Sequence, residues 1–311
     1  MSGLVTPMAL RVAVTLGLPD RLREEPATAR ELAPELGVDP LALDLLLAHL
    51  TTLGVTERTD AGHRTTPFGA HLCVNADNNL NNALDQNSAA GRADLAFVDL
   101  LHSVRTGEPA YPVRYGQGFW EDLTEQPRLR ATFDAQMTDR QRDWVPQVVR
   151  NYDWARFGTL VDVGGGHGSL LAAILKANPG MRGHLVDLEE TAAGARAVLA
   201  LYELGDRVEV TAGSFFDPLP AGDACLLFDV LHDWDDQDAL RILGRCADAC
   251  DRVLVVESLG GSTEFDLVML VHFGGRDRGL HDFERLASVH GLRLESVHRL
   301  TDGRSLLEFT R

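Results

Sequence analysis

The sequence lacks long hydrophobic runs and is poor in cysteine. Its apolar runs, such as Ala224 to Phe228, fall far short of the roughly 18 to 20 residues needed to cross a bilayer. We therefore expect no transmembrane helix. The four cysteines have neither metal-ligand spacing nor a disulfide pattern, which predicts reduced, buried thiols in a cytoplasmic protein.

Positive charge is also scarce. Lys176 is the only lysine, and Lys plus Arg number 29 against 46 Asp plus Glu, which gives a formal net charge of -17. Such a chain repels phosphate backbones and anionic membrane surfaces on average, so we expect neither nucleic acid nor a membrane as a partner. The length of 311 residues allows one large domain or two smaller ones, each with its own core.

Residues 1–92 carry the pattern of short helices followed by a hairpin. A capping box at Thr28 begins one helix, and Asp39, which precedes a proline, begins the next. The segments 55–59 and 63–66 alternate apolar and polar side chains on either side of a turn. Two helices and a hairpin in this order predict an α-helical winged-helix domain.

A winged helix can bind DNA, but the local charge argues against that function here. Residues 1–75 contain six arginines and nine acids. The helix that would enter a DNA groove carries no basic side chain apart from His49, so it cannot supply the phosphate contacts on which such binding depends. A DNA-binding regulator is therefore disfavoured.

From residue 159 onward, short apolar strands alternate with helices. This alternation predicts a seven-stranded, doubly wound, Rossmann-like α/β sheet whose last two strands form an antiparallel hairpin. We expect a helical linker over residues 93–150, and hence two domains, 1–92 and 93–311. The asparagine-rich segment 75–87 is expected to be a loop. The expected strands are 159–163, 184–188, 208–211, 224–228, 253–257, 292–298 and 305–310.

The first of these strands leads into a glycine-rich loop that suggests a cofactor. Gly164, Gly166 and Gly168 have the spacing G-x-G-x-G, which is tighter than the G-x-G-x-x-G of dinucleotide-binding loops. Asp162 precedes them by two residues. Bare backbone beside an acid suits a ligand with an ammonium and a carboxylate group, and S-adenosylmethionine fits that description. Asp187, at the end of the next strand, is placed to accept hydrogen bonds from ribose hydroxyls.

His232 follows the fourth strand, at the same edge of the sheet. A neutral imidazole, with an ordinary pKa near 6.5, can take the proton of a phenol as its oxygen attacks a methyl group. Glu257 ends the neighbouring strand and is expected to fix the imidazole tautomer. Alternatively, His232 caps a helix whose first turn, 233–236, is acidic. The two roles are compatible.

These motifs together resemble the S-adenosylmethionine-dependent O-methyltransferases of the plant caffeate and bacterial aromatic polyketide type. The resemblance covers nearly the whole chain and rests mainly on Asp-Val-Gly-Gly-Gly at 162–166 and Leu-His-Asp-Trp at 231–234. It implies a methyltransferase of bacterial secondary metabolism, such as antibiotic biosynthesis, that acts on a hydroxyl of a small phenolic or polyketide-like aromatic metabolite. It also implies S-adenosylhomocysteine as product, no metal, and a homodimer held by the N-terminal domain.

The resemblance implies a set of site residues as well. His232 is the general base, flanked by Glu257 and Asp277. Besides the residues already named, the expected cofactor-binding residues are Leu188, Ser214, Phe215, Phe228 and Asp229. Apart from the resemblance, the soft and aromatic side chains of Met137, Trp144, Met269, His272 and Phe273 suit a planar ring, so we expect them to form the acceptor pocket; the alternative is that they pack in the core. The identity of the acceptor is not readable from the sequence.

Three positions depart from the family pattern. Ser214 stands where an acid is usual, Asp229 stands where relatives place a cation against the cofactor, and Asp277 stands where Glu is commoner. These departures keep an alternative open, in which an enzyme of the same fold catalyses hydroxylation, decarboxylation or a pericyclic reaction on a similar metabolite.

Overall fold

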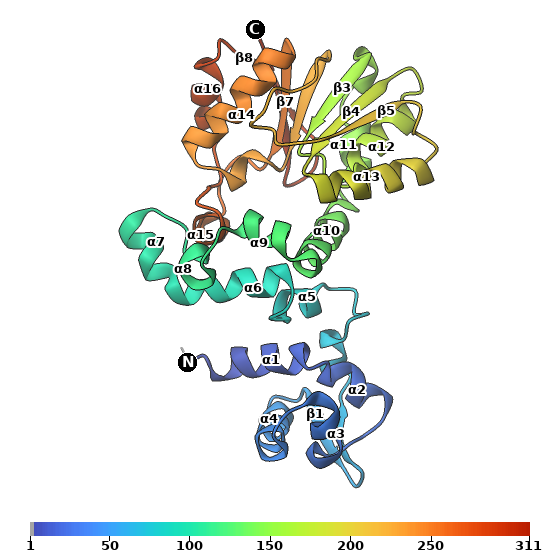
Figure 1. Ribbon diagram of the computed structural model, residues 1–311, viewed down its shortest axis with the longest axis vertical. Coiled ribbons are helices and arrows are strands. Elements are labelled where there is room, and N and C mark those ends of the chain that lie inside the picture. Colours follow the sequence, from blue (N-terminus) through green and yellow to red (C-terminus); the bar gives the residue numbers. More distant parts are fainter. Residues whose placement is uncertain (1–2) are drawn as a thin grey trace. The chain divides into compact units, whose positions relative to one another are not determined.

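The computed structural model describes residues 3–311, which divide into two compact units (Figure 1). The first unit comprises the chain up to Val98 together with Glu125–Gln136, and the second comprises Asp99–Thr124 and Met137–Arg311. The segment expected as a helical linker thus contributes residues to both units.

The first unit begins with four helices and a hairpin, as a winged helix requires. Thr28 and Glu31 form the expected capping box, and the Asp39 side chain accepts a hydrogen bond from the amide of Ala42. Buried leucines such as Leu47 make its core. The elements are α1 (Val5–Thr15), α2 (Leu18–Glu24), α3 (Ala29–Leu36), α4 (Pro40–Thr52), β1 (Thr56–Thr59), β2 (Gly62–Thr65) and the 3-10 helix η1 (Gly69–Leu72).

The asparagine-rich segment is not entirely a loop, because it contains the short helix α5 (Leu80–Leu84). Asn78 accepts a hydrogen bond from the amide of Leu80, and Asn79 stands at the N-cap position with φ 56°. The asparagines therefore start a helix here, and the prediction of a loop was wrong for these five residues. Helix α6 (Ala89–Leu95) and the 3-10 helix η2 (Ala96–Asp99) follow.

Between residue 100 and the first strand of the sheet, the chain forms a series of mostly short helices. Glycines end two of them, since Gly107 and Gly116 adopt the left-handed conformation at the C-caps of α7 and α8. The helices are α7 (Leu100–Thr106), α8 (Tyr111–Tyr115), α9 (Phe119–Glu125), α10 (Pro127–Gln141), α11 (Val145–Arg150) and the 3-10 helix η3 (Trp154–Arg156).

The seven-stranded sheet of the second unit has the order β5-β4-β3-β6-β7-β9-β8. Strands β3 to β7 are parallel, and β9 is antiparallel to both β7 and β8. This confirms the seven predicted strands and the C-terminal hairpin, with ends shifted by at most two residues. The strands are β3 (Thr159–Val163), β4 (Arg182–Asp187), β5 (Val208–Ala212), β6 (Ala224–Phe228), β7 (Arg252–Glu257), β8 (Arg293–Arg299) and β9 (Ser305–Thr310).

Helices cover both faces of this sheet, as Figure 1 shows. All five residues of β6 are buried, and they alternate between two separate apolar cores. One core includes α11 and α12 (Ser169–Ala177), and the other includes α14 (Asp236–Ala249) and α16 (Leu280–Ser288). The two other helices are α13 (Glu189–Leu201) and α15 (Thr263–His272). The parallel strands therefore end together at one edge of the sheet, where Asp187 and Glu257 terminate β4 and β7.

The four cysteines are free and buried, as expected from their spacing. No helix among residues 3–311 is long and apolar enough to span a bilayer.

Candidate active site

The glycine-rich loop folds closely over Asp162. Gly164, Gly166 and Gly168 have φ values of 72°, 58° and 76°, which L side chains rarely adopt. A Cβ atom on Gly165 would lie 2.6 Å from Asp162 Oδ2. The loop therefore depends on glycine both for its conformation and for its contact with the carboxylate.

Asp162 is a buried carboxylate with an unsatisfied oxygen. It is 2% exposed, and its Oδ2 accepts no hydrogen bond from the residues that the structure describes. Burial, together with the charge of Asp187, raises the pKa of Asp162 to about 7. A bound cation or hydrogen-bond donor would satisfy this oxygen, and the ammonium-bearing cofactor expected from the sequence supplies such a group.

Asp187 fixes the same loop from the end of β4. Its Oδ2 accepts a hydrogen bond of 2.8 Å from the Gly166 amide, and its Oδ1 accepts one from the Leu188 amide. Leu188 itself is the N-cap residue of α13. The ring of Phe215 comes within 3.5 Å of the position that a Cβ on Gly164 would take. The expected cofactor-binding residues from β3, β4 and the segment after β5 thus lie around one loop.

The Ser214 hydroxyl makes a local hydrogen bond, which it accepts from the Phe216 amide. Phe215 packs edge-on against Trp234, with 5.6 Å between ring centroids. An aromatic side chain therefore lies beside the glycine loop, while the serine supports its own turn.

His232 lies in the 3-10 helix η4 (Leu231–Asp233), directly after β6. Its Nδ1 is 2.6 Å from Glu257 Oε2, and the other carboxylate oxygen accepts hydrogen bonds from the backbone amides of Leu231 and His232. Glu257 therefore holds both the imidazole ring and the turn that carries it. The alternative role for His232 was wrong, because the N-cap residue of α14 is Asp235.

A second carboxylate lies at the opposite side of the imidazole. Asp233 Oδ1 is 3.4 Å from His232 Nε2, although the sequence suggested for Asp233 only a place in the first turn of a helix. Burial would lower the pKa of His232, but Glu257, Asp233 and Asp229 outweigh it and raise that pKa well above 6.5. Burial raises the pKa of Asp233 to about 7. The surrounding carboxylates therefore favour the protonated form of the imidazole.

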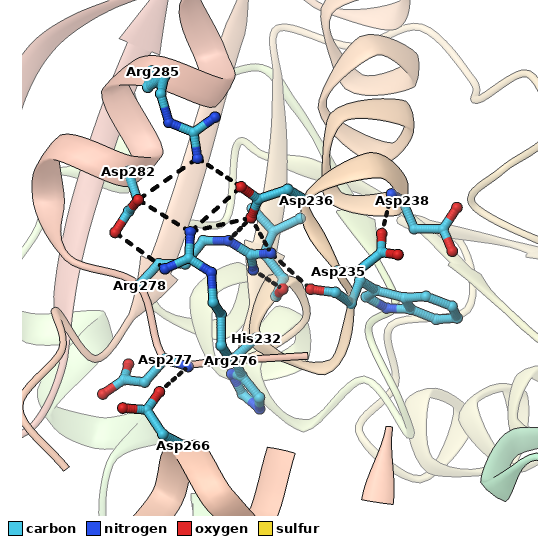
Figure 2. A network of polar contacts seen from close by, with 12 residues as sticks. His232, Asp235, Asp236, Asp238, Asp266, Arg276, Asp277, Arg278, Asp282 and Arg285 are labelled. Atoms are coloured by element: carbon cyan, nitrogen blue, oxygen red, sulfur yellow. Dashed lines mark hydrogen bonds and ion pairs between the residues drawn. The ribbon is translucent and has the colours of Figure 1, made fainter. Parts of the chain in front are cut away.

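Arg278 also binds the turn that carries His232. This side chain is fully buried, and its guanidinium donates hydrogen bonds to the carbonyl oxygens of Leu231 and Trp234, at 2.5 and 2.7 Å. Asp236 accepts two further hydrogen bonds from it (Figure 2). Because Glu257 binds the amides of the turn and Arg278 binds its carbonyls, the backbone that presents His232 is held through both kinds of backbone polar group.

Gly275 packs directly on the same turn. A Cβ at this position would lie 2.1 Å from the carbonyl oxygen of His232. Figure 2 shows Arg276, Arg278 and Arg285 converging on Asp236, which ties this segment to the start of α14. Sequence reasoning gave no role to Arg278, although it stands next to Asp277, which was expected to flank the base.

Asp277 does not contact His232 through any hydrogen bond or ion pair within the described residues. It accepts a hydrogen bond of 2.6 Å from the Ser258 hydroxyl, and its amide donates to Asp266. A role beside the base thus has no direct geometric support, and the catalytic assignment of Asp277 stays a prediction.

Asp229, which follows Phe228 at the end of β6, forms an ion pair with Arg304. Its Oδ1 is 2.7 Å from Arg304 Nε, and the guanidinium lies 4.4 Å from the ring centroid of Trp144. Facing atoms of Asp229, His232 and Glu257 lie within 4.8 Å of one another. These residue types can also ligate metals, but here His232 is bound to Glu257 and Asp229 is paired with Arg304, so the cluster is a network of two adjacent charge pairs.

A cavity of about 600 Å³ adjoins this network. Trp144, Arg304 and Asp277 line it together with Phe265, whose ring centroid is 5.2 Å from that of His232. Of the five residues expected to form the acceptor pocket, only Trp144 lines this cavity.

The other four expected acceptor residues lie elsewhere in the second unit. Met269 and His272 are buried in α15, and Met137 lies half-buried in α10. Phe273 stacks on Trp120, with 5.5 Å between ring centroids. Their assignment to an acceptor pocket remains a prediction.

Comparison with known proteins links this geometry to one enzyme family. Residues 97–293 match a family model described as an O-methyltransferase domain, and residues 1–75 match one described as an O-methyltransferase dimerisation domain. A solved structure of the O-methyltransferase NcsB1 from neocarzinostatin biosynthesis, in complex with S-adenosyl-L-homocysteine and 1,4-dihydroxy-2-naphthoic acid, matches with a TM-score of 0.93 and 43% identity. That match covers 99% of this chain and 97% of the other.

Two curated relatives have different activities, one a methyl transfer and the other a hydroxylation. The 2,7-dihydroxy-5-methyl-1-naphthoate 7-O-methyltransferase of Streptomyces carzinostaticus is 44% identical over 310 residues, which are 97% of this chain and 93% of the relative. The aclacinomycin 10-hydroxylase RdmB of Streptomyces purpurascens is 42% identical over 325 residues, covering 99% of this chain and 86% of the relative.

Proposed function

The chain belongs to the S-adenosylmethionine-dependent O-methyltransferase family, and we propose that it transfers a methyl group to a hydroxyl of a small aromatic metabolite in bacterial secondary metabolism. The observation that carries this proposal is the contact of 2.6 Å between His232 Nδ1 and Glu257 Oε2. With Nδ1 bound to Glu257, the proton is taken by Nε2, the ring nitrogen that lies 3.4 Å from Asp233 Oδ1.

The base then acts as follows. The neutral imidazole accepts the proton of the acceptor hydroxyl at Nε2 while the oxygen forms its bond to the methyl group. Glu257 accepts the Nδ1 hydrogen bond throughout and stabilises the imidazolium that results. Arg278 and Gly275 keep the turn in place, so that the ring does not have to reorient during the reaction.

The cofactor, when bound, supplies a methyl group on a sulfonium cation. We assign its site to Asp162, the glycine loop and Asp187, because the unsatisfied oxygen of Asp162 requires a cationic or donor partner. A solved relative contains S-adenosyl-L-homocysteine, which supports the identity of the cofactor. Phe215 is assigned to the same site, since its ring lies beside Gly164.

The charge state of His232 sets a condition on this mechanism. The surrounding carboxylates favour the imidazolium, whereas the base must be neutral to accept a proton. A cationic cofactor held at the glycine loop would favour the neutral form of His232, because two positive charges near each other repel. For the free enzyme, kcat/KM is therefore expected to rise with pH well beyond 6.5.

We also propose that the chain forms a homodimer through its N-terminal unit. The dimerisation-domain match supports this, and so do the exposed apolar side chains Leu41 and Leu45 on α4. Light scattering at micromolar concentration tests the proposal, and the mass of a 34.0 kDa monomer would contradict it.

Hydroxylation is the second candidate function, favoured by the relative RdmB and by the departure at Asp229. The two functions make different demands on His232, because only deprotonation of an acceptor hydroxyl requires this base. Methyl transfer is preferred since the His232–Glu257 pair is intact.

Replacement of the base tests the proposed mechanism. His232→Gln should lower turnover by about 10² to 10⁴-fold while leaving the affinity for S-adenosyl-L-homocysteine nearly unchanged. The loss should shrink as the pH approaches the pKa of the acceptor, because the phenolate then forms without a base. His281→Gln, at an exposed position of α16, is the matched control. A His232→Gln enzyme as active as the wild type at every pH would exclude His232 as the base.

A further inference from the structure

Three carboxylates surround His232, and one of them, Asp229, forms an ion pair with Arg304. Glu257 lies at Nδ1 and Asp233 at Nε2, while the carboxylate of Asp229 is within 4.8 Å of the facing atoms of His232 and Glu257. Among the described residues, Arg304 is the one arginine or lysine that forms an ion pair with any of these three acids, and it pairs with Asp229. The charge at the candidate base therefore depends on a residue that the proposed mechanism does not use.

Arg304 is held firmly in this position. It lies in the turn between β8 and β9, and its side chain is 11% exposed. The Nε atom is 2.7 Å from Asp229 Oδ1, and the guanidinium stacks over the ring of Trp144 from the other side. A carboxylate and an aromatic face together fix the orientation of the guanidinium.

Asp229 is placed by an unusual backbone conformation. It has φ 53°, in the left-handed region that non-glycine residues seldom adopt, and its amide donates a hydrogen bond to the carbonyl of Val256 in β7. Strain of this kind persists where the surrounding structure enforces it, and it is concentrated at functional sites. Here it turns the side chain of Asp229 between Arg304 and the His232–Glu257 pair.

We propose that Arg304 is a positioning residue for His232. By binding Asp229, Arg304 keeps that carboxylate from competing with Glu257 for the imidazole, so that Glu257 alone holds Nδ1. The inference rests on the proposed role of His232 as the base, and it adds to that role the residue that controls its charge.

Loss of Arg304 should act on His232 through Asp229. The freed carboxylate would remain buried beside the imidazole and would stabilise the imidazolium, because opposite charges at this distance favour the charged form. The other groups around the ring stay the same: Glu257 from β7, Asp233 from η4 and the ring of Phe265 from α15. Two further arginines also stay in place, since Arg140 acts on Asp233 and Arg278 acts on Glu257. A change in the titration of His232 can then be attributed to the Arg304–Asp229 pair.

The test is a titration of the His232 ring nitrogens by NMR in the cofactor-free protein, with the signals assigned through the His232→Gln variant. Arg304→Gln should raise the midpoint by about one pH unit, and Arg304→Lys should stay close to the wild type. The double variant Arg304→Gln, Asp229→Asn should return to the wild-type midpoint. Arg293→Gln, which removes one charge from an exposed position of the same hairpin, is the control.

An unchanged midpoint in Arg304→Gln, or a double variant that stays shifted, would overturn the inference. If Arg304→Gln does not fold, the Asp229→Asn variant tests the inference instead. It must lower the titration midpoint of His232 if the Asp229 carboxylate acts on the imidazole. Turnover gives a second readout: Arg304→Gln should lose about tenfold at neutral pH and recover as the pH rises. Shifted midpoints without any methyl transfer would instead count against the proposed function alone.

Discussion

Replacing Asp162 with Asn should stabilise the ligand-free protein and weaken cofactor binding. A carboxyl group whose pKa is higher in the folded than in the unfolded chain binds its proton more tightly when folded. Stability is then lost as the pH rises from the unfolded pKa toward the folded one. For Asp162 this window runs from the ordinary 3.8 to about 7. An asparagine does not titrate, so the variant avoids that loss.

The size of the effect follows from the pKa difference. A shift of about three units corresponds to about 4 kcal/mol, which is the upper limit of the stabilisation at pH 8, since the buried amide also lacks partners. Loss of a charged hydrogen-bond acceptor should weaken cofactor binding by about 1.5 to 3 kcal/mol, or roughly 10 to 100-fold. One substitution should therefore move fold stability and ligand affinity in opposite directions.

Urea denaturation across the pH range, together with calorimetric titration of S-adenosyl-L-homocysteine, measures both quantities. The stability difference between variant and wild type should be absent near pH 4, grow up to pH 7 and stay constant above it. Asp251→Asn, at an exposed site before β7, controls for the loss of one charge. A difference that does not vary with pH, or an unchanged affinity, would refute the role given to Asp162.

Three further predictions concern the turn that carries the base. Arg278→Met should lower turnover by more than tenfold in a steady-state assay, because two carbonyl groups of the turn lose their hydrogen-bond donor. Arg276→Gln, in the same charged cluster, should change turnover little and is the control. Gly275→Ala should lower the melting temperature, since its Cβ would collide with the backbone of the turn. Burial raises the pKa of Asp236, but hydrogen bonds from Arg285 and Arg278 outweigh it and lower this pKa to about 2. Asp236→Asn should therefore destabilise the protein most above pH 4, and the difference should vanish toward pH 2 in thermal melts.

The parts of the site that follow from the sequence lie close to strand ends. Asp162, Asp187, His232 and Glu257 each stand at or just after the carboxyl end of a parallel strand, and these ends share one edge of the sheet. Locating the strands by their apolar pattern was therefore enough to bring these residues together. The capping box at Thr28 was predictable for a similar reason, because all of its contacts are local.

The parts that the sequence did not reveal depend on contacts between distant segments. Arg304 is 75 positions from Asp229, and Arg278 is 47 from Leu231, so no local pattern relates them. The charge of Asp233 was visible, but its distance from His232 Nε2 depends on the fold of the turn. The pKa of the base departs from its ordinary value for the same reason, since three carboxylates converge on His232 only in the folded chain.

The most direct test of the account is the fate of the methyl group. The enzyme should be incubated with S-adenosylmethionine that carries a deuterated methyl group and with a dihydroxynaphthoic acid, and the products should be analysed by mass spectrometry. The account predicts S-adenosyl-L-homocysteine and a methylated acceptor in equal amounts, with all three deuterium atoms in the new methoxy group. An acceptor that gains oxygen or loses carbon dioxide, with no label and no S-adenosyl-L-homocysteine, would contradict it.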